Sequence, residues 1–227
     1  PTRRSSDLMI TGLMDISADT DALNGDVVVQ NADIAAVAAL ANQQTDKIAG
    51  KANLTAHISG TAHNPTVKLD GDVLQGTAGG YDIHDVALDL RLLDHIIYIN
   101  KLSGSQGAKG LFSASGTVSI DGPVNVKFSA SDLEFGMFTG LAGLKAENVT
   151  GTADIEAVLG GYTYNPSADV TVKAVNGGMQ GASFDSLTGE AHLKNGLIDL
   201  PEMKVVKQVG ERNCSVVAKG IVPLRAL

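Results

Sequence analysis

The sequence predicts an all-β fold of many antiparallel strands, and three observations lead to this prediction. Apolar and polar residues alternate with a period of two along most of the chain, which places them on opposite faces of a strand. The chain has 26 glycines among its 227 residues, an aromatic content of only 4%, and turn-forming pairs between the alternating runs. A Gly-x-x-x-Asn-Pro pattern also recurs after 101 residues, at 60–65 and 161–166.

The alternating runs predict the individual strands in order. They include residues 52–58, 86–92, 124–130, 153–159 and 168–174, each with apolar residues at every second position. Alternation on one face favours an antiparallel sheet over a buried parallel one. The residues predicted to line the apolar face are Leu54, Ile58, Val67, Leu69, Val86, Leu88, Leu90, Leu92, Val126, Phe128, Ile155, Leu159, Val170, Val172 and Leu193.

Two segments depart from the period of two. In 33–44 and 132–144, apolar residues fall at helical intervals, and each segment begins with an aspartate, Asp33 or Asp132. Aspartate caps the free N–H groups at a helix start. The sequence therefore predicts two short linker helices over these ranges.

The long repeat predicts how the chain is divided. At an offset of 101, residues 50–65 match residues 151–166 at six positions, including Gly50, Ala52 and Pro65. We expect the end of one repeat in 9–45, a whole repeat in 46–145 and a second, truncated one in 146–227. Residues 1–8 differ in character from the rest and are interpreted as a non-native remnant.

Composition and spacing argue against several classes of function. A formal charge of −8 without clustered Lys or Arg is unsuited to nucleic acid. The five histidines lie singly, the one cysteine has no partner, and no metal-binding or nucleophile–base spacing occurs. We therefore expect neither an enzyme, nor a cofactor, nor a metal site. No apolar run approaches the ~20 residues of a membrane-spanning helix.

The two predicted helices are too short to cover one face of so many strands. That face can close into a barrel, pack as a sandwich or curl into a trough that holds an apolar guest. Alternation alone slightly favours a sandwich. Small aliphatic side chains with few aromatic or polar groups suit acyl chains better than a specific small molecule.

The stretch GKANLTAHISGTAHNPTVKLDGDVLQGTAGGYDIHDVALDL (50–90) resembles the repeat of the TamB and AsmA-like envelope proteins. The segments DIAAVAA (33–39) and DLEFGMF (132–138) resemble the Asp-Leu-x-x-Leu linker of that family. The resemblance covers residues 8–227. It implies a long, U-shaped sheet with an open apolar groove, in the periplasmic part of a protein anchored in the inner membrane outside this segment.

The resemblance also implies a function. The expected role is to bind or conduct phospholipid between the inner and outer membranes, with acyl chains lying on the fifteen residues named above. The alternative is a scaffold or chaperone that pairs strands with an outer-membrane barrel protein, an autotransporter or a nascent β-rich client. A third interpretation is a closed, repetitive surface module without a ligand.

Overall fold

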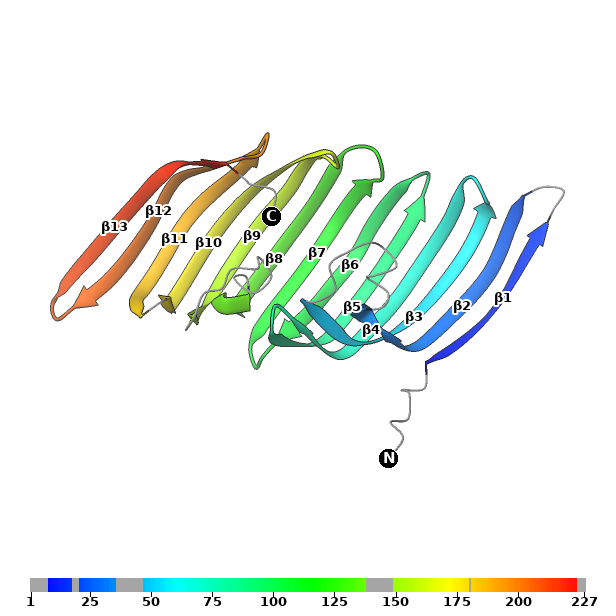
Figure 1. The fold of residues 1–227 in the computed structure, drawn as a ribbon, viewed down its shortest axis with the longest axis horizontal. Coiled ribbons are helices and arrows are strands. Elements are labelled where there is room, and N and C mark those ends of the chain that lie inside the picture. Colours follow the sequence, from blue (N-terminus) through cyan, green and yellow to red (C-terminus); the bar gives the residue numbers. More distant parts are fainter. Residues whose placement is uncertain (1–7, 18–20, 36–46, 138–148, 180, 224–227) are drawn as a thin grey trace, which may run out of the picture.

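The protein is one antiparallel sheet of thirteen strands whose spatial order is the order of the sequence (Figure 1). A computed structural model describes residues 8–17, 21–35, 47–137, 149–179 and 181–223. The strands are β1 Met9–Ser17, β2 Ala22–Asp33, β3 Ile48–Thr61, β4 Pro65–Ala78, β5 Tyr81–Leu93, β6 Ile96–Gln106, β7 Gly110–Ser119, β8 Val124–Glu134, β9 Thr150–Tyr162, β10 Asn165–Met179, β11 Ala182–Lys194, β12 Leu197–Val209 and β13 Arg212–Pro223.

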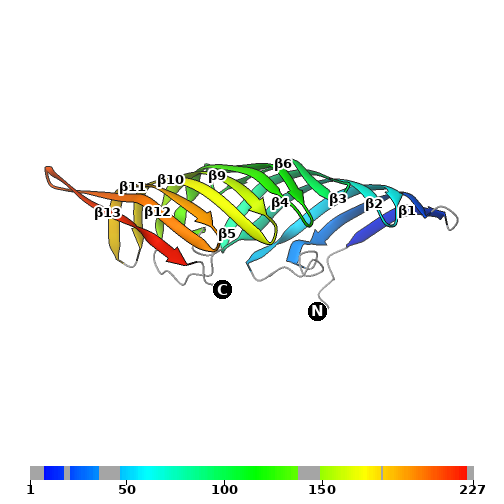
Figure 2. The same cartoon turned by 90° about the horizontal axis from the view of Figure 1, so that it is seen from above.

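The prediction of an all-β antiparallel fold is confirmed. The described strands form a single layer that is weakly curled (Figure 2). Every strand pairs with its sequence neighbours. Most connections have two to four residues, whereas residues 34–47 separate β2 from β3 and residues 135–149 separate β8 from β9.

The strands repeat with a period of six. At an offset of about 101 residues, β2 to β7 correspond to β8 to β13, and β1 corresponds to β7. Side-chain contacts recur with them: the amide of Asn64 donates to Asp94 Oδ1 at 3.0 Å, and that of Asn165 donates to Asn195 Oδ1 at 3.0 Å. A hydrogen bond thus links each Asn-Pro turn to the next turn on the same side of the sheet.

The backbone conformation at the first position of the repeated motif requires glycine. Gly60 and Gly161 have φ values of +91° and +76°, which residues with a side chain rarely adopt. A Cβ on Gly161 would lie 2.6 Å from the carbonyl oxygen of Asn165. Since Gly161 is paired with Pro166 at the start of β10, the motif marks a tight strand–turn–strand junction.

Replacing Gly161 by alanine is expected to lower the free energy of unfolding by about 1–3 kcal/mol, because the new Cβ meets backbone atoms at a positive φ. Urea denaturation measures the change. Gly220→Ala is the matched control, since no atom lies within 4 Å of its Cβ position. Equal effects of the two substitutions would contradict this assignment.

The strand ends on the side of the sheet away from the Asn-Pro turns contain bulges, and we call this side the bulged edge. Asn31, Asp85, Asp132 and Asn176 have φ values of +51° to +57°, and the pairing register shifts next to each of them. The N–H of Asn31 donates to Asn53 Oδ1 at 3.2 Å, and that of Asp132 donates to Asp154 Oδ1 at 3.0 Å, at equivalent positions of the repeat. Such bulges increase the local twist and bend the edge.

The buried core lies beside this bulged edge, on one face. One cluster contains Ala52, Val73 and Val86, with Ile34 packed against it. The other contains Ala130, Leu133 and Met137. Residues 34–35 and 135–137 are helical, and Ile34 and Met137 from these stretches belong to or pack against the core clusters.

The predicted helix boundaries need correction. Asp33 ends β2, although its side chain accepts the N–H of Ala35 at 3.0 Å as a cap would. The predicted start at Asp132 is wrong, because Asp132 and Leu133 belong to β8 and helix begins at Phe135. The rest of both predicted helices, 36–44 and 138–144, lies outside the described residues.

Candidate functional site

The strand registers bring all fifteen predicted apolar residues to one face of the sheet. Directly paired residues of antiparallel strands share a face. Leu69, for example, pairs with Ala56 on one side and Leu90 on the other, and Val126 pairs with Leu159. The placement on one face is therefore a property of the structure, whereas lipid binding at these residues stays a prediction.

A continuous row of paired apolar residues crosses this face along the whole sheet, and we call it the apolar track. It includes one residue from each of the thirteen strands. At ~4.8 Å between strands, the track is about 60 Å long. Its members are Gly12, Val27, Ala56, Leu69, Leu90, Ile99, Gly116, Val126, Leu159, Ala168, Leu193, Ile198 and Val222.

Parallel apolar rows flank the track on the same face. Ile58 and Leu92 belong to the row nearer the Asn-Pro turns, through their pairs with Val67. Leu88 and Phe128 belong to a row nearer the bulged edge, where the face passes into the two core clusters. The rows together make a broad apolar surface, and none of the residues in the track is polar or charged.

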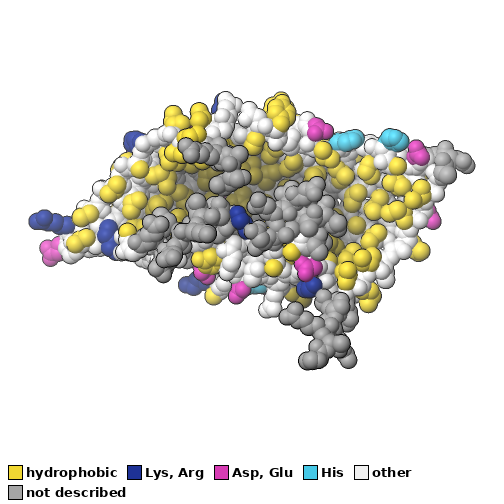
Figure 3. Space-filling view, in the orientation of Figure 1, with side chains coloured by type: hydrophobic (Ala, Val, Ile, Leu, Met, Phe, Trp, Pro, Cys, Tyr) yellow, Lys and Arg dark blue, Asp and Glu magenta, His cyan; other side chains and the backbone are white. Residues whose placement is uncertain are grey.

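Most of this surface is only half-buried. Of the fifteen predicted residues, Val86 and Val126 are buried, twelve are intermediate, and Leu159 is exposed at 39%. Figure 3 shows hydrophobic side chains spread over this face, with charged side chains mainly at its margins. The described residues include no second sheet to cover it.

Large side chains fill the gaps above glycines of the same face. A Cβ on Gly71 would lie 2.6 Å from Leu54 Cδ2, and a Cβ on Gly104 would lie 2.5 Å from the ring of Phe112. These side chains therefore lean over their small neighbours.

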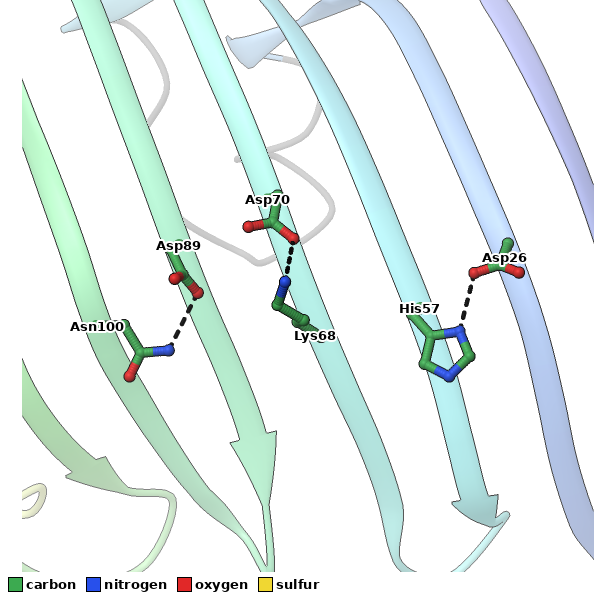
Figure 4. Close-up of polar contacts among 6 residues, drawn as sticks. All are labelled: Asp26, His57, Lys68, Asp70, Asp89 and Asn100. Atoms are coloured by element: carbon green, nitrogen blue, oxygen red, sulfur yellow. Dashed lines mark hydrogen bonds and ion pairs between the residues drawn. The ribbon is translucent and has the colours of Figure 1, made fainter.

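The opposite face carries the polar side chains (Figure 4). His57 Nδ1 lies 2.8 Å from Asp26 Oδ1, and Lys68 Nζ lies 3.0 Å from Asp70 Oδ2. The Asn100 amide donates to Asp89 at 3.0 Å. Exposed pairs of this kind contribute little to stability, so their main effect is to keep this face solvated.

His84 connects β5 to the β6–β7 turn at the bulged edge. Its Nδ1 lies 2.8 Å from Asp85 Oδ2, and its Nε2 lies 2.8 Å from the carbonyl oxygen of Gly107. Both partners are hydrogen-bond acceptors, so a ring that is protonated on both nitrogens donates one hydrogen bond to each of them. The Gly107 carbonyl and then Asp85 raise the pKa of His84 above its usual value of 6.5.

The raised pKa of His84 predicts a pH dependence of stability. A group whose pKa is raised by folding stabilises fully below its unfolded pKa, and this contribution is lost as pH rises through the folded pKa. Between about pH 6 and pH 8, wild type should lose more stability than His84→Gln. Urea midpoints measure this difference, and His63→Gln, whose side chain is 89% exposed, is the control. Identical pH profiles for wild type and H84Q would refute the prediction.

The sequence did not identify every apolar residue of this face. Ile97, Ile99 and Leu102 on β6 are paired with Leu92, Leu90 and Leu88, yet they were not among the predicted residues. The run Ile96–Ile99 is apolar at every position, so alternation alone leaves open which side chains share the apolar face. The clear alternation in the neighbouring strand β5 is the signal that could have resolved this choice.

Comparison with protein-family models, curated proteins and solved structures gave no match to this chain. The described residues contain no group of three side chains arranged to hold a metal ion. Among the same residues, no helix has the length and apolar character needed to cross a bilayer. The case for a function therefore depends on the apolar face itself.

Proposed function

We propose that this chain binds phospholipid acyl chains along the apolar track. The observation that carries the proposal is an apolar row that extends over thirteen strands, is half-buried in most of them and exposed in β1 and β13, and has no covering layer among the described residues. An exposed apolar surface of this extent is unusual for a soluble domain without a partner.

The chemistry of the face favours a long, flexible, apolar guest. Each methylene group of the guest that is removed from water contributes about 0.8 kcal/mol to the free energy of binding, whatever its position along the track. The track has no converging polar groups that would select a particular headgroup. A hydrocarbon chain is therefore held in many equivalent positions and can move along the track without losing one dominant contact.

The proposed setting follows from the resemblance of residues 50–90 to the TamB and AsmA-like repeat. In that setting the chain is the periplasmic part of an inner-membrane-anchored envelope protein. Its sheet conducts phospholipid between the inner and outer membranes. The anchor and the membrane partners then lie in regions outside this chain.

Lipid analysis of the purified chain tests the proposal. Native mass spectrometry is expected to find phospholipid bound to the protein as purified. A photo-crosslinking residue at position 54, 88 or 170 should label added phospholipid. The same residue at position 55, 89 or 171, on the polar face of the same strands, should not. Absence of bound lipid together with equal labelling from both faces would reject the proposal.

A second candidate function is scaffolding of outer-membrane proteins or autotransporters through strand pairing. The observation that favours it is that every residue of β1 and β13, the two outermost of the described strands, is exposed. In that case, prolines in the edge strands should abolish client binding. Charged substitutions on the track should leave it unchanged.

A further inference from the structure

Two exposed tyrosines form a stacked pair at the turn between β9 and β10. Tyr162 is 50% exposed and Tyr164 is 78% exposed. Their ring centroids lie 5.4 Å apart, with an angle of 25° between the ring planes. The chain has only four tyrosines and no tryptophan. Other aromatic side chains, such as Tyr81 and Phe128, pack against a core cluster, whereas this pair lies in solvent.

The repeat contains an equivalent turn without these rings. At an offset of 101 residues, Tyr162 corresponds to Thr61. At the same offset, Tyr164 corresponds to His63. The glycine, the asparagine and the proline of the repeated motif are the same in both turns. The two turns therefore differ mainly in whether they present a pair of aromatic rings to solvent.

The backbone contacts of the two turns are equivalent. In the first turn, the N–H of Ala62 donates to the carbonyl oxygen of Asp21 at 3.0 Å. In the second, the N–H of Thr163 donates to the carbonyl oxygen of Gly122, also at 3.0 Å. Gly122 lies 101 residues after Asp21, so the same contact stabilises both turns. Because threonine and histidine suffice to form this turn, its fold does not account for the tyrosines.

The groups around the pair are polar and uncharged. Residues 157–168 contain no charged residue. The side-chain amide of Asn165, next to Tyr164 in the chain, donates to Asn195 Oδ1 at 3.0 Å, and both asparagines are exposed. This bond uses one N–H group of Asn165. The amide oxygen of Asn165 and the N–H groups of Asn195 can therefore bond to a ligand that approaches from solvent.

We propose that this turn binds a neutral glycan built of β-linked glucopyranose-type rings. The hydroxyl groups of such a ring lie around its rim, and C–H groups cover its two flat faces. The face of an aromatic ring is electron-rich and attracts C–H groups of this kind. The tyrosine pair supplies the flat apolar platform. The amides of Asn165 and Asn195 supply hydrogen bonds to the hydroxyl groups at the rim.

Other classes of ligand fit this turn less well. A cationic or anionic ligand would meet no opposite charge within residues 157–168. A proline-rich peptide docks into a groove lined by aromatic side chains, whereas Tyr162 and Tyr164 are stacked on each other. The turn lies outside the apolar track, whose members on β9 and β10 are Leu159 and Ala168. The inference is therefore independent of whether the track binds lipid.

Titration of the whole chain with cellohexaose and with chitohexaose, followed by ligand-observed NMR, tests the proposal. The matched variant is Tyr162→Thr with Tyr164→His, which gives this turn the residues of the first repeat. We expect it to weaken binding of the hexasaccharide about tenfold or more, because it removes stacking by two rings. Its urea midpoint should equal that of wild type. Equal binding by the two proteins, or no binding of either hexasaccharide to wild type, would overturn the proposal.

Transfer of the site to the first repeat is a second measurement. Thr61→Tyr, His63→Tyr and Asp94→Asn are added to the double variant described above. These changes recreate the two rings and the second amide at the equivalent turn, and we expect them to restore hexasaccharide binding. A transferred site that does not bind would show that the rings and amides are not sufficient. Stronger binding of a polyproline peptide than of either hexasaccharide to wild type would identify a peptide site and refute the proposal.

Discussion

Replacing Leu133 by alanine is expected to lower the free energy of unfolding by about 2–5 kcal/mol, the range typical of buried leucines. The Leu133 side chain is 0% exposed, the lowest value among the described hydrophobic residues of the core. It belongs to a cluster with Ala130 and Met137, and Tyr81 and Phe112 pack against this cluster. The substitution removes contacts between β8, the helical turn at 135–137 and the neighbouring strands at once.

The large effect is expected because the single-layer sheet has few other buried side chains. Urea denaturation at constant pH measures the loss. Leu13→Ala on β1 is the control, since that side chain is 86% exposed and its truncation should cost less than about 0.5 kcal/mol. A cost for L133A no larger than that for L13A would mean that the cluster does not stabilise the sheet.

For the fifteen predicted residues, alternation was sufficient to predict the face of the sheet on which each one lies. Leu54, Leu90 and Val170 alternate with polar residues in their own strands, and the registers place them together. The prediction succeeds because a strand with one apolar face has a strongly preferred register. The neighbours across the sheet were not predictable from periodicity alone, since they depend on turn geometry and bulges.

The bulges explain where sequence reasoning failed. Next to Asp85, strict alternation is interrupted, because Val86 and Ile83 both contribute to one core cluster although they are three positions apart. The sequence predicts Asp132 to cap a helix because aspartate suits that role. The same residue type also tolerates positive φ, which is the role it has in β8. The amino-acid type alone therefore does not distinguish a helix cap from a bulge residue with positive φ.

A lysine on the apolar track should impair lipid binding far more than one on the polar face. Leu159 and Val158 are neighbours on β9 with similar exposures of 39% and 45%, but they lie on opposite faces. Leu159 pairs with Val126 and Ala168, whereas Val158 pairs with Lys127 and Asp169. Leu159→Lys places an ammonium group where we propose that acyl chains lie, at a cost that no nearby carboxylate on the track offsets.

We expect Leu159→Lys to reduce bound phospholipid about tenfold and Val158→Lys to change it by less than about twofold. Lipid bound per protein, measured by native mass spectrometry, gives both values from matched preparations. Urea midpoints of the two variants should agree with each other, because both side chains are already exposed and neither substitution leaves a cavity. If Leu159→Lys unfolded the protein while Val158→Lys did not, the apolar face would be acting as a closed core. If both variants retained lipid fully, the guest would have to bind somewhere other than the track.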